Sequence, residues 1–119
     1  MLSASNRGAA ISSEVLDSDA ALHAPDLLDA EVANALRKAW LRNELQADRG
    51  QLALETLPAL PILRHSVAPL LPRVWALRQV MTAYDACYVS LAEVLGAPLV
   101  TCDARLARAH GHVARIELR

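Results

Sequence analysis

Apolar residues recur at helical spacing along the first half of the chain. The strongest stripe predicts a helix over about residues 26–40, and its members are Leu28, Val32, Ala35, Leu36, Ala39 and Trp40. Asp26 and Asp29 stand three residues apart, close to a capping box, so this helix is expected to begin at Asp26. A second helix is predicted over about residues 48–57, with its leucines partly buried and Pro58 in the turn after it.

Two more helical patterns follow in the second half. Residues 69–81 predict a helix whose inward side chains are Leu70, Leu71, Val74, Leu77 and Val80. Thr82 is a favourable N-cap for a helix over residues 83–95, and Gly96 is a favourable end for it. After its first turn that helix is apolar nearly all round, with Glu93 as its charged residue, so we expect it to be buried.

Short apolar runs between the helices suit strands. Four strands are predicted, at residues 22–24, 62–65, 98–101 and 113–118. A weak helical stretch lies around residues 9–16, and a short helix is expected over residues 103–109. Because strands alternate with helices, the chain is expected to form one α/β domain over residues 1–119, with a parallel sheet and helical crossovers.

Composition indicates a protein in solution in a reducing compartment. Hydrophobic residues make up 54% of the chain, yet no apolar run is long enough to cross a membrane. No basic segment followed by an apolar block marks a secretory signal. The two cysteines, Cys87 and Cys102, form neither a disulfide framework nor a metal knuckle. We therefore expect a cytoplasmic protein with no membrane partner.

Charge, aromatic content and motifs exclude several function classes. The net charge of −1 gives no whole-protein field that attracts nucleic acid, so RNA binding would need a local patch. Aromatic residues are 3% of the chain, which argues against a platform on which bases stack. The chain contains no HExxH, P-loop, GxGxxG or GxSxG motif. His110 and His112, near the C-terminus, are interpreted as part of a solvated turn rather than a metal site.

Three acids at element ends or core edges are the candidates for chemistry. Glu31 flanks the apolar stripe of its helix and points toward the core edge, unless it snorkels at the core margin. Asp85 lies in the first turn of a buried helix, whose positive end favours a carboxylate, unless it only caps with Thr82. Asp103 follows a predicted strand, at the edge where open α/β sheets bind ligands, unless it is only an N-cap.

Convergence of these acids would create a site for a hard cation. Carboxylate oxygens are the ligands that Mg²⁺ and Mn²⁺ prefer. A metal held in this way activates water and stabilises the charge of a phosphodiester that is displaced in line. We therefore predict one metal site built from Glu31, Asp85 and Asp103.

The residues around the acids resemble the VapC toxins of the PIN-domain superfamily. The matching blocks are residues 24–32, APDLLDAEV, residues 77–92, LRQVMTAYDACYVSLA, and residues 98–106, PLVTCDARL. They occur in order and at family spacing over residues 8–119, and TxYDAxYV followed by TxDxRL is specific to the family. The resemblance implies a PIN-like three-layer fold, a parallel sheet with helices on both faces.

The same resemblance implies an activity and partners. Glu31, Asp85 and Asp103 would be the catalytic and metal-binding acids of an endoribonuclease that depends on Mg²⁺ or Mn²⁺. A cognate antitoxin would hold the enzyme in check, and members of the family commonly form homodimers. Arg78 and Arg105, near the matching blocks, are candidates for contacts with RNA phosphates, the alternative being a solvated face.

The start of the chain departs from the family pattern. VapC toxins open with a hydrophobic strand that ends in an Asp, whereas residues 1–7 show no such strand and no acid precedes Glu14. Glu14 and Asp17 are expected to be solvated rather than to replace that Asp. Because the resemblance places the first strand between residues 22–24 and 99–101, the chain is expected to lack a central strand and to be poorly stable alone.

Two functions from different classes follow. The first is the toxin of a type II toxin-antitoxin system, a metal-dependent endoribonuclease. The alternative is a non-catalytic PIN remnant that only binds an antitoxin or a sister subunit. The DNA upstream of the start codon discriminates between them, because an in-frame strand ending in Asp favours the enzyme and a stop codon or frame shift favours the remnant.

Overall fold

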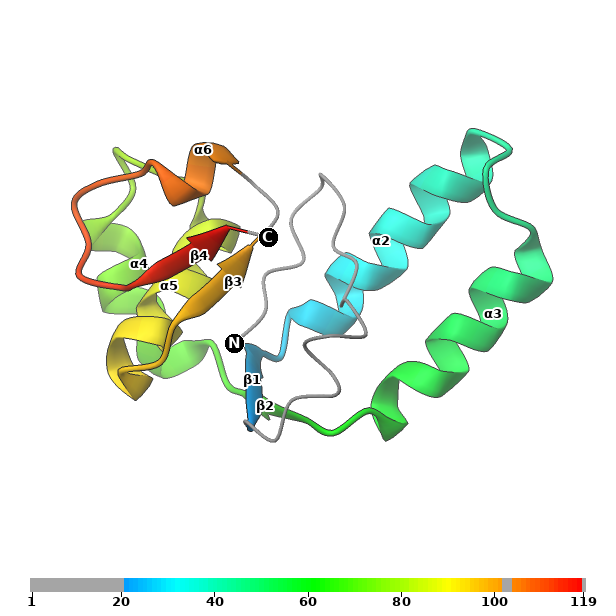
Figure 1. The fold of residues 1–119 in the computed structure, drawn as a ribbon, viewed down its shortest axis with the longest axis horizontal. Coiled ribbons are helices and arrows are strands. Elements are labelled where there is room, and N and C mark those ends of the chain that lie inside the picture. Colours follow the sequence, from blue (N-terminus) through cyan, green and yellow to red (C-terminus); the bar gives the residue numbers. More distant parts are fainter. Residues whose placement is uncertain (1–20, 102–103, 119) are drawn as a thin grey trace.

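Strands and helices alternate along the chain, as predicted for an α/β protein (Figure 1). The computed structural model describes residues 21–101 and 104–118. In chain order its elements are β1 (Leu22–Pro25), α2 (Leu28–Leu41), α3 (Ala47–Thr56), the 3₁₀ helix η1 (Leu57–Ala59), β2 (Ile62–His65), the 3₁₀ helix η2 (Ala68–Leu70), α4 (Leu71–Ala76), α5 (Ala83–Leu95), β3 (Leu99–Thr101), α6 (Ala104–Ala107) and β4 (Ile116–Leu118). Three predictions lie outside the described residues. They are the helix around residues 9–16, the absence of a hydrophobic strand in residues 1–7 and the site role of Asp103.

Both strand pairs among the described residues are parallel, which confirms that part of the prediction. β1 pairs with β2, with Leu22 opposite Ile62, and β3 pairs with β4, with Leu99 opposite Ile116. Within the described ranges these are two separate two-stranded sheets and not one continuous sheet. Helix α5 packs against both β1 and β3 and so joins the two sheets through the core. The expected place of a central strand, between β1 and β3, remains a prediction.

Helix α5 forms the centre of the core. The Thr82 hydroxyl oxygen accepts a hydrogen bond from the backbone N–H of Asp85 at 3.2 Å, and Gly96 ends the helix in the left-handed conformation at φ 62°. Every residue from Ala86 to Ala92 is buried. Burying each large apolar side chain stabilises the fold by about 1.5–3 kcal/mol. The prediction of a capped, buried helix is confirmed, except that Val94 and Leu95, in the last turn, are exposed.

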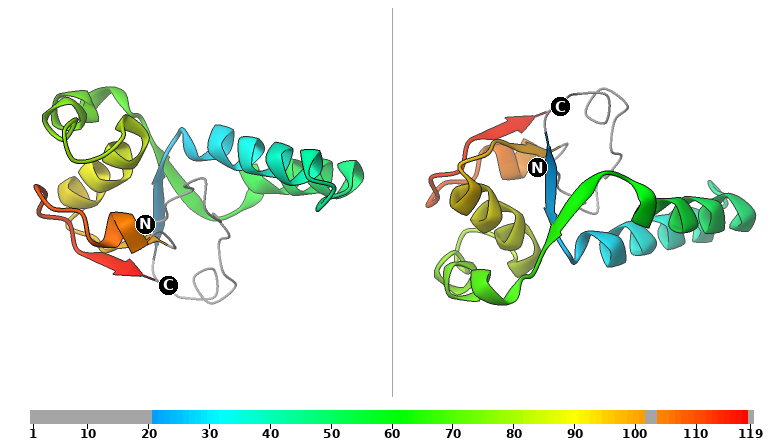
Figure 2. Two further views of the ribbon diagram at one scale, coloured as in Figure 1. Left: turned by 90° about the horizontal axis from the view of Figure 1, so that it is seen from above. Right: turned by 90° about the horizontal axis from the view of Figure 1, so that it is seen from below.

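Helices α2 and α3 form a hairpin that projects from the rest of the protein (Figure 2). α3 buries none of its residues, so the expected partial burial of Leu52 and Leu54 is wrong, whereas Leu57, just after α3, is buried. The helical pattern of α3 is real, but the helix contacts α2 and η1 rather than the core. Ala47 and Leu54 of α3, with Leu36 and Trp40 of α2, line a shallow groove of about 250 Å³.

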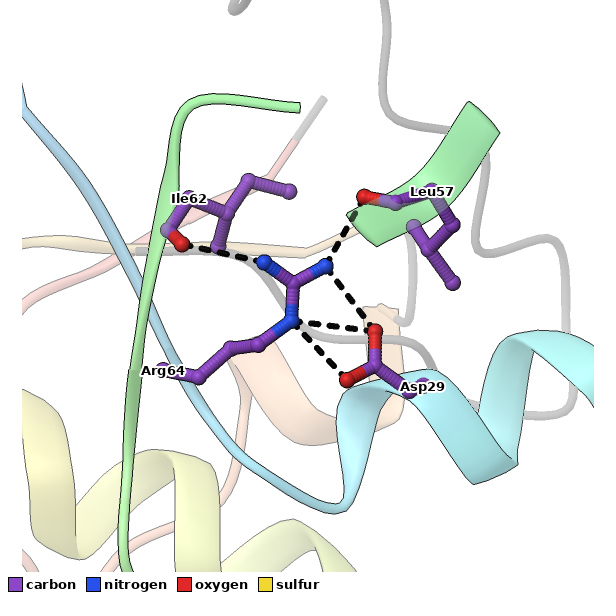
Figure 3. A network of polar contacts seen from close by, with 4 residues as sticks. All are labelled: Asp29, Leu57, Ile62 and Arg64. Carbon is purple, nitrogen blue, oxygen red and sulfur yellow. Dashed lines mark hydrogen bonds and ion pairs between the residues drawn. The ribbon is translucent and has the colours of Figure 1, made fainter. Parts of the chain in front are cut away.

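Arg64 of β2 fastens the base of this hairpin (Figure 3). Asp29 does not cap α2, because the helix begins after Leu27 and has no side-chain cap. Instead its carboxylate accepts hydrogen bonds of 2.9 Å from Nε and Nη2 of Arg64. The same guanidinium donates to the carbonyls of Leu57 at 3.0 Å and Ile62 at 3.1 Å. One side chain thus ties together the first turn of α2, strand β2 and the end of α3.

Helix α4 is shorter than the predicted helix over residues 69–81. It ends at Ala76 and is followed by a turn. Pro72 lies in its first turn, where the missing N–H of proline is tolerated, so prolines restrict where this helix starts. The expectation that Leu71 and Val80 point inward is wrong, because both are exposed.

Glu93 of α5 joins three segments of the C-terminal half. Its carboxylate accepts hydrogen bonds from Arg73 Nε of α4 at 2.9 Å and from the backbone N–H of Val113 at 2.8 Å. Arg73 Nη2 also donates to the carbonyl of Gly111 at 3.1 Å. The bonds from Arg73 are the main reason why the pKa of Glu93 lies below its ordinary value.

Glu93→Gln is expected to destabilise the fold by about 1–2 kcal/mol near neutral pH. Because the pKa of Glu93 is lowered in the folded state, its contribution is present above the ordinary Glu pKa and is lost as the pH falls through the lowered value. Urea melts of the wild type and the variant should therefore converge in acid. Glu55→Gln, on the exposed face of α3, is the control and should change little. An equal deficit at neutral and acid pH would contradict this role of the charge.

Candidate active site

Two of the three predicted acids come together from distant parts of the chain. Glu31 lies in the first turn of α2, and Asp85 lies in the first turn of α5. Each therefore stands at the positive end of a helix. The structure describes neither the side chain of Asp103 nor its backbone, so its membership of the site remains a prediction.

Tyr88 connects the two first turns. Its hydroxyl donates a hydrogen bond to Oε1 of Glu31 at 2.6 Å, and its ring is buried, with 1% of the residue exposed. Tyr88 is three residues after Asp85, so both side chains lie on the same face of α5. The carboxylate of Glu31 thus contacts a buried side chain of α5, at the core edge that the sequence predicted.

Glu31, Asp85 and Tyr88 form a corner between α2 and α5. The surroundings in this corner oppose the negative charge on Glu31. Burial is the largest cause that raises the pKa of Glu31, and the negative charge of Asp85 raises it further, while the bond from Tyr88 acts in the opposite direction. Burial also raises the pKa of Cys87, and the charge of Glu31 adds to that effect. The corner is therefore half-buried and negative, an environment that a bound cation would relieve.

A cavity of about 440 Å³ opens beside Asp85. Its polar lining comprises Arg78, Gln79, Thr82, Asp85 and Arg105, and its apolar lining comprises Val80, Met81, Leu106 and Ala109. It therefore places two guanidinium-bearing side chains next to a carboxylate at a helix start. Such a lining suits an anionic ligand that also reaches a metal at the carboxylates.

Glu31 and Asp85 fit the ligand preference of a hard divalent cation. Both offer carboxylate oxygens, and Mg²⁺ commonly binds one or two carboxylates and keeps several waters. The described part of the chain contains no group of three or more His, Cys, Asp or Glu side chains arranged to hold a metal. His112 is used in a turn, where its Nδ1 accepts from the backbone N–H of Ala114 and its Nε2 lies 3.1 Å from the carbonyl of Ala109.

Sequence reasoning did not assign a role to Tyr88. The signal was present, because a buried tyrosine hydroxyl needs a hydrogen-bond partner and Tyr88 shares a helix face with Asp85. What the sequence could not supply was the partner, since Glu31 lies on another helix far away in the chain.

Comparisons with known proteins identify the family of the chain. The sequence profile of the PIN domain matches residues 2–111. Ribonuclease VapC12 of Mycobacterium tuberculosis (strain ATCC 25618 / H37Rv) is 43% identical over 97 residues, which cover 82% of this chain and 75% of that protein. Ribonuclease VapC1 of the same strain is 46% identical over 97 residues, covering 81% and 73%. VapC ribonuclease Mb0985 of Mycobacterium bovis is 46% identical over 85 residues, covering 71% and 67%.

Proposed function

Because the chain belongs to the VapC ribonucleases of the PIN-domain family, we propose that it is a metal-dependent endoribonuclease, the toxin of a type II toxin-antitoxin system. The observation that carries the proposal is the hydrogen bond from Tyr88 that holds Glu31 in the negative corner beside Asp85. Relatives named ribonucleases support RNA as the substrate. Glu31, Asp85 and Asp103 are the proposed catalytic and metal-binding residues.

The side chains of this corner suggest how the reaction is organised. Mg²⁺ or Mn²⁺, when bound, supplies a Lewis acid that activates water and offsets negative charge on the cleaved phosphodiester. Tyr88 fixes Oε1 of Glu31, which leaves the other carboxylate oxygen for a ligand. Thr82 orders the first turn of α5 by accepting a bond from the backbone N–H of Asp85, and so helps to place Asp85.

Cleavage of a circular RNA tests this proposal, because a circle has no ends and only an internal cut linearises it. A folded preparation of the protein should linearise the circle with Mg²⁺ or Mn²⁺, and EDTA should stop the reaction. Absence of cutting with either metal by a protein that melts cooperatively would contradict the enzyme and favour the non-catalytic binding module.

We also propose a cognate antitoxin protein as a partner, a homodimer in solution and a cytoplasmic location. None of the described helices combines the length and apolar character that a membrane span requires. Light scattering of the purified protein should give about twice the 12.9 kDa of one chain. Co-expression with the antitoxin should suppress the growth arrest that the toxin causes alone.

Tyr88→Phe is expected to weaken Mn²⁺ binding by about 10- to 100-fold, as loss of an outer-shell partner of a metal ligand commonly does. The phenyl ring fills the same buried space, so the fold should survive the change. Calorimetric titration with Mn²⁺ measures the effect. Tyr84→Phe is the matched control, because Tyr84 is an exposed tyrosine of the same helix. Equal Mn²⁺ affinity in Tyr88→Phe and the wild type would show that the hydroxyl does not position Glu31.

A further inference from the structure

A negative corner alone is a poor site for RNA. Glu31 and Asp85 both end in carboxylates, and the chain as a whole has a net charge of −1. A polyanion therefore needs local cations close to these acids before it can approach them. The cavity beside Asp85 supplies two candidates, Arg78 and Arg105.

Arg78 has a fixed position at this cavity. Its guanidinium carbon lies 4.7 Å from the centre of the Trp75 ring, and its Nη1 donates to the Trp75 carbonyl at 2.9 Å. Trp75 is 68% exposed, which is unusual for so large an apolar ring. Stacking and the hydrogen bond together hold the guanidinium plane, so less side-chain entropy is lost when a ligand binds it.

The arginines of neighbouring elements are used differently. Arg64 pairs with Asp29, and Arg73 pairs with Glu93, each at 2.9 Å. Across residues 21–101 and 104–118, no carboxylate pairs with Arg78, although an arginine has five N–H donors and the carbonyl of Trp75 takes one of them. The remaining donors suit the two oxygens of a phosphodiester, which a guanidinium can bind in a bidentate manner.

We propose that Arg78, stacked on Trp75, binds an RNA phosphate in the cavity beside Asp85. This inference rests on the proposed ribonuclease function. The phosphate would belong to a nucleotide next to the cleaved bond, because Asp85 lines the same cavity and is itself a proposed metal ligand. Arg78 therefore sets which part of the RNA backbone lies over the acids.

The test measures RNA binding apart from cleavage. Fluorescence anisotropy of a single-stranded RNA oligonucleotide is recorded in EDTA over a range of salt concentrations, with the full 119-residue chain. Arg78→Gln should weaken binding about tenfold and reduce the slope of log K against log salt by about 0.7, the value for one lost phosphate contact on a single strand. Arg78→Lys should keep the slope but bind several-fold more weakly, because lysine lacks the planar fork.

Two further variants keep the result interpretable. Trp75→Leu should weaken binding without changing the salt slope, because it removes the support of Arg78 and not its charge. Arg49→Gln, an exposed arginine on α3, should bind like the wild type. Wild-type affinity and slope in Arg78→Gln would overturn the proposal, and so would a wild type that does not bind RNA.

The same experiments separate this proposal from the proposed function. If the wild type linearises circular RNA while Arg78→Gln binds RNA normally, the ribonuclease stands and the role of Arg78 is wrong. If Arg78→Gln loses RNA affinity while the wild type never cuts, the phosphate site stands and the ribonuclease is wrong.

Discussion

Asp85→Asn should lower the rate of RNA cleavage by about a thousandfold or more, while leaving the fold nearly intact. The N-cap of α5 is the Thr82 hydroxyl, which bonds the backbone N–H of residue 85, so this cap survives the substitution. Asparagine keeps the size and polarity of the side chain but removes the anionic oxygens that a hard cation prefers. We expect the free energy of unfolding to change by less than about 0.5 kcal/mol.

Cleavage gels and thermal melts, run on both proteins, separate the catalytic role from a structural one. Asp48→Asn is the matched control, because Asp48 also lies in the first turn of a helix and bonds the adjacent backbone N–H of Arg49 at 2.9 Å. It should cut RNA like the wild type. An Asp85→Asn protein that unfolds would assign the carboxylate a structural role, and one that cuts normally would remove it from the active site.

Glu31→Gln should prevent metal binding and cleavage while making the metal-free protein more stable. Burial and Asp85 raise the pKa of Glu31, so its ionised form is disfavoured in the folded state. The wild type is therefore relatively most stable below the ordinary Glu pKa and loses stability as the pH rises through the raised value. Glutamine cannot ionise, and its side-chain oxygen can still accept the bond from Tyr88, so the metal-free variant is expected to be the more stable protein near neutral pH.

Thermal melts with and without Mn²⁺ check this prediction. Mn²⁺ should raise the melting temperature of the wild type, because a ligand that binds only the folded state stabilises it, and should not affect Glu31→Gln. In acid without metal the two proteins should converge. If the variant were less stable than the wild type at neutral pH, the charge of Glu31 would stabilise the metal-free fold, which contradicts the prediction.

The sequence predicted α5 well because its limits depend on local chemistry. Thr82 caps the helix by a bond within its first turn, and Gly96 takes a left-handed conformation that other residues adopt at a cost. Its nearly continuous apolar run also predicted burial, since such a helix has no face suited to water. Strand β2, at Ile62–His65, was likewise predicted with its observed bounds.

The errors arose where a distant partner decides the structure. Asp29 looked like a helix cap, but its carboxylate binds Arg64, which no local pattern indicates. Periodicity showed that α3 is a helix. It did not show that α3 belongs to a projecting hairpin, which keeps its leucines away from the core. The same limit applies to the site, because sequence reasoning predicted that Glu31 and Asp85 converge, but only the fold shows that Tyr88 connects them.

A thiol lies beside the candidate site, and burial and the charge of Glu31 both disfavour its ionisation. Cys87 follows Asp85 by two residues on α5, is 4% exposed, and has its pKa raised by burial first and then by the charges of Glu31 and Asp26. Oxidants attack the thiolate rather than the thiol, so this cysteine should resist sulfenic acid formation and glutathione mixed disulfides. Metal binding would cancel part of the nearby negative charge, but burial, the larger cause, would remain. Cys87 is therefore expected to stay unreactive during oxidative stress, mainly because it is buried and partly because its neighbours are negative.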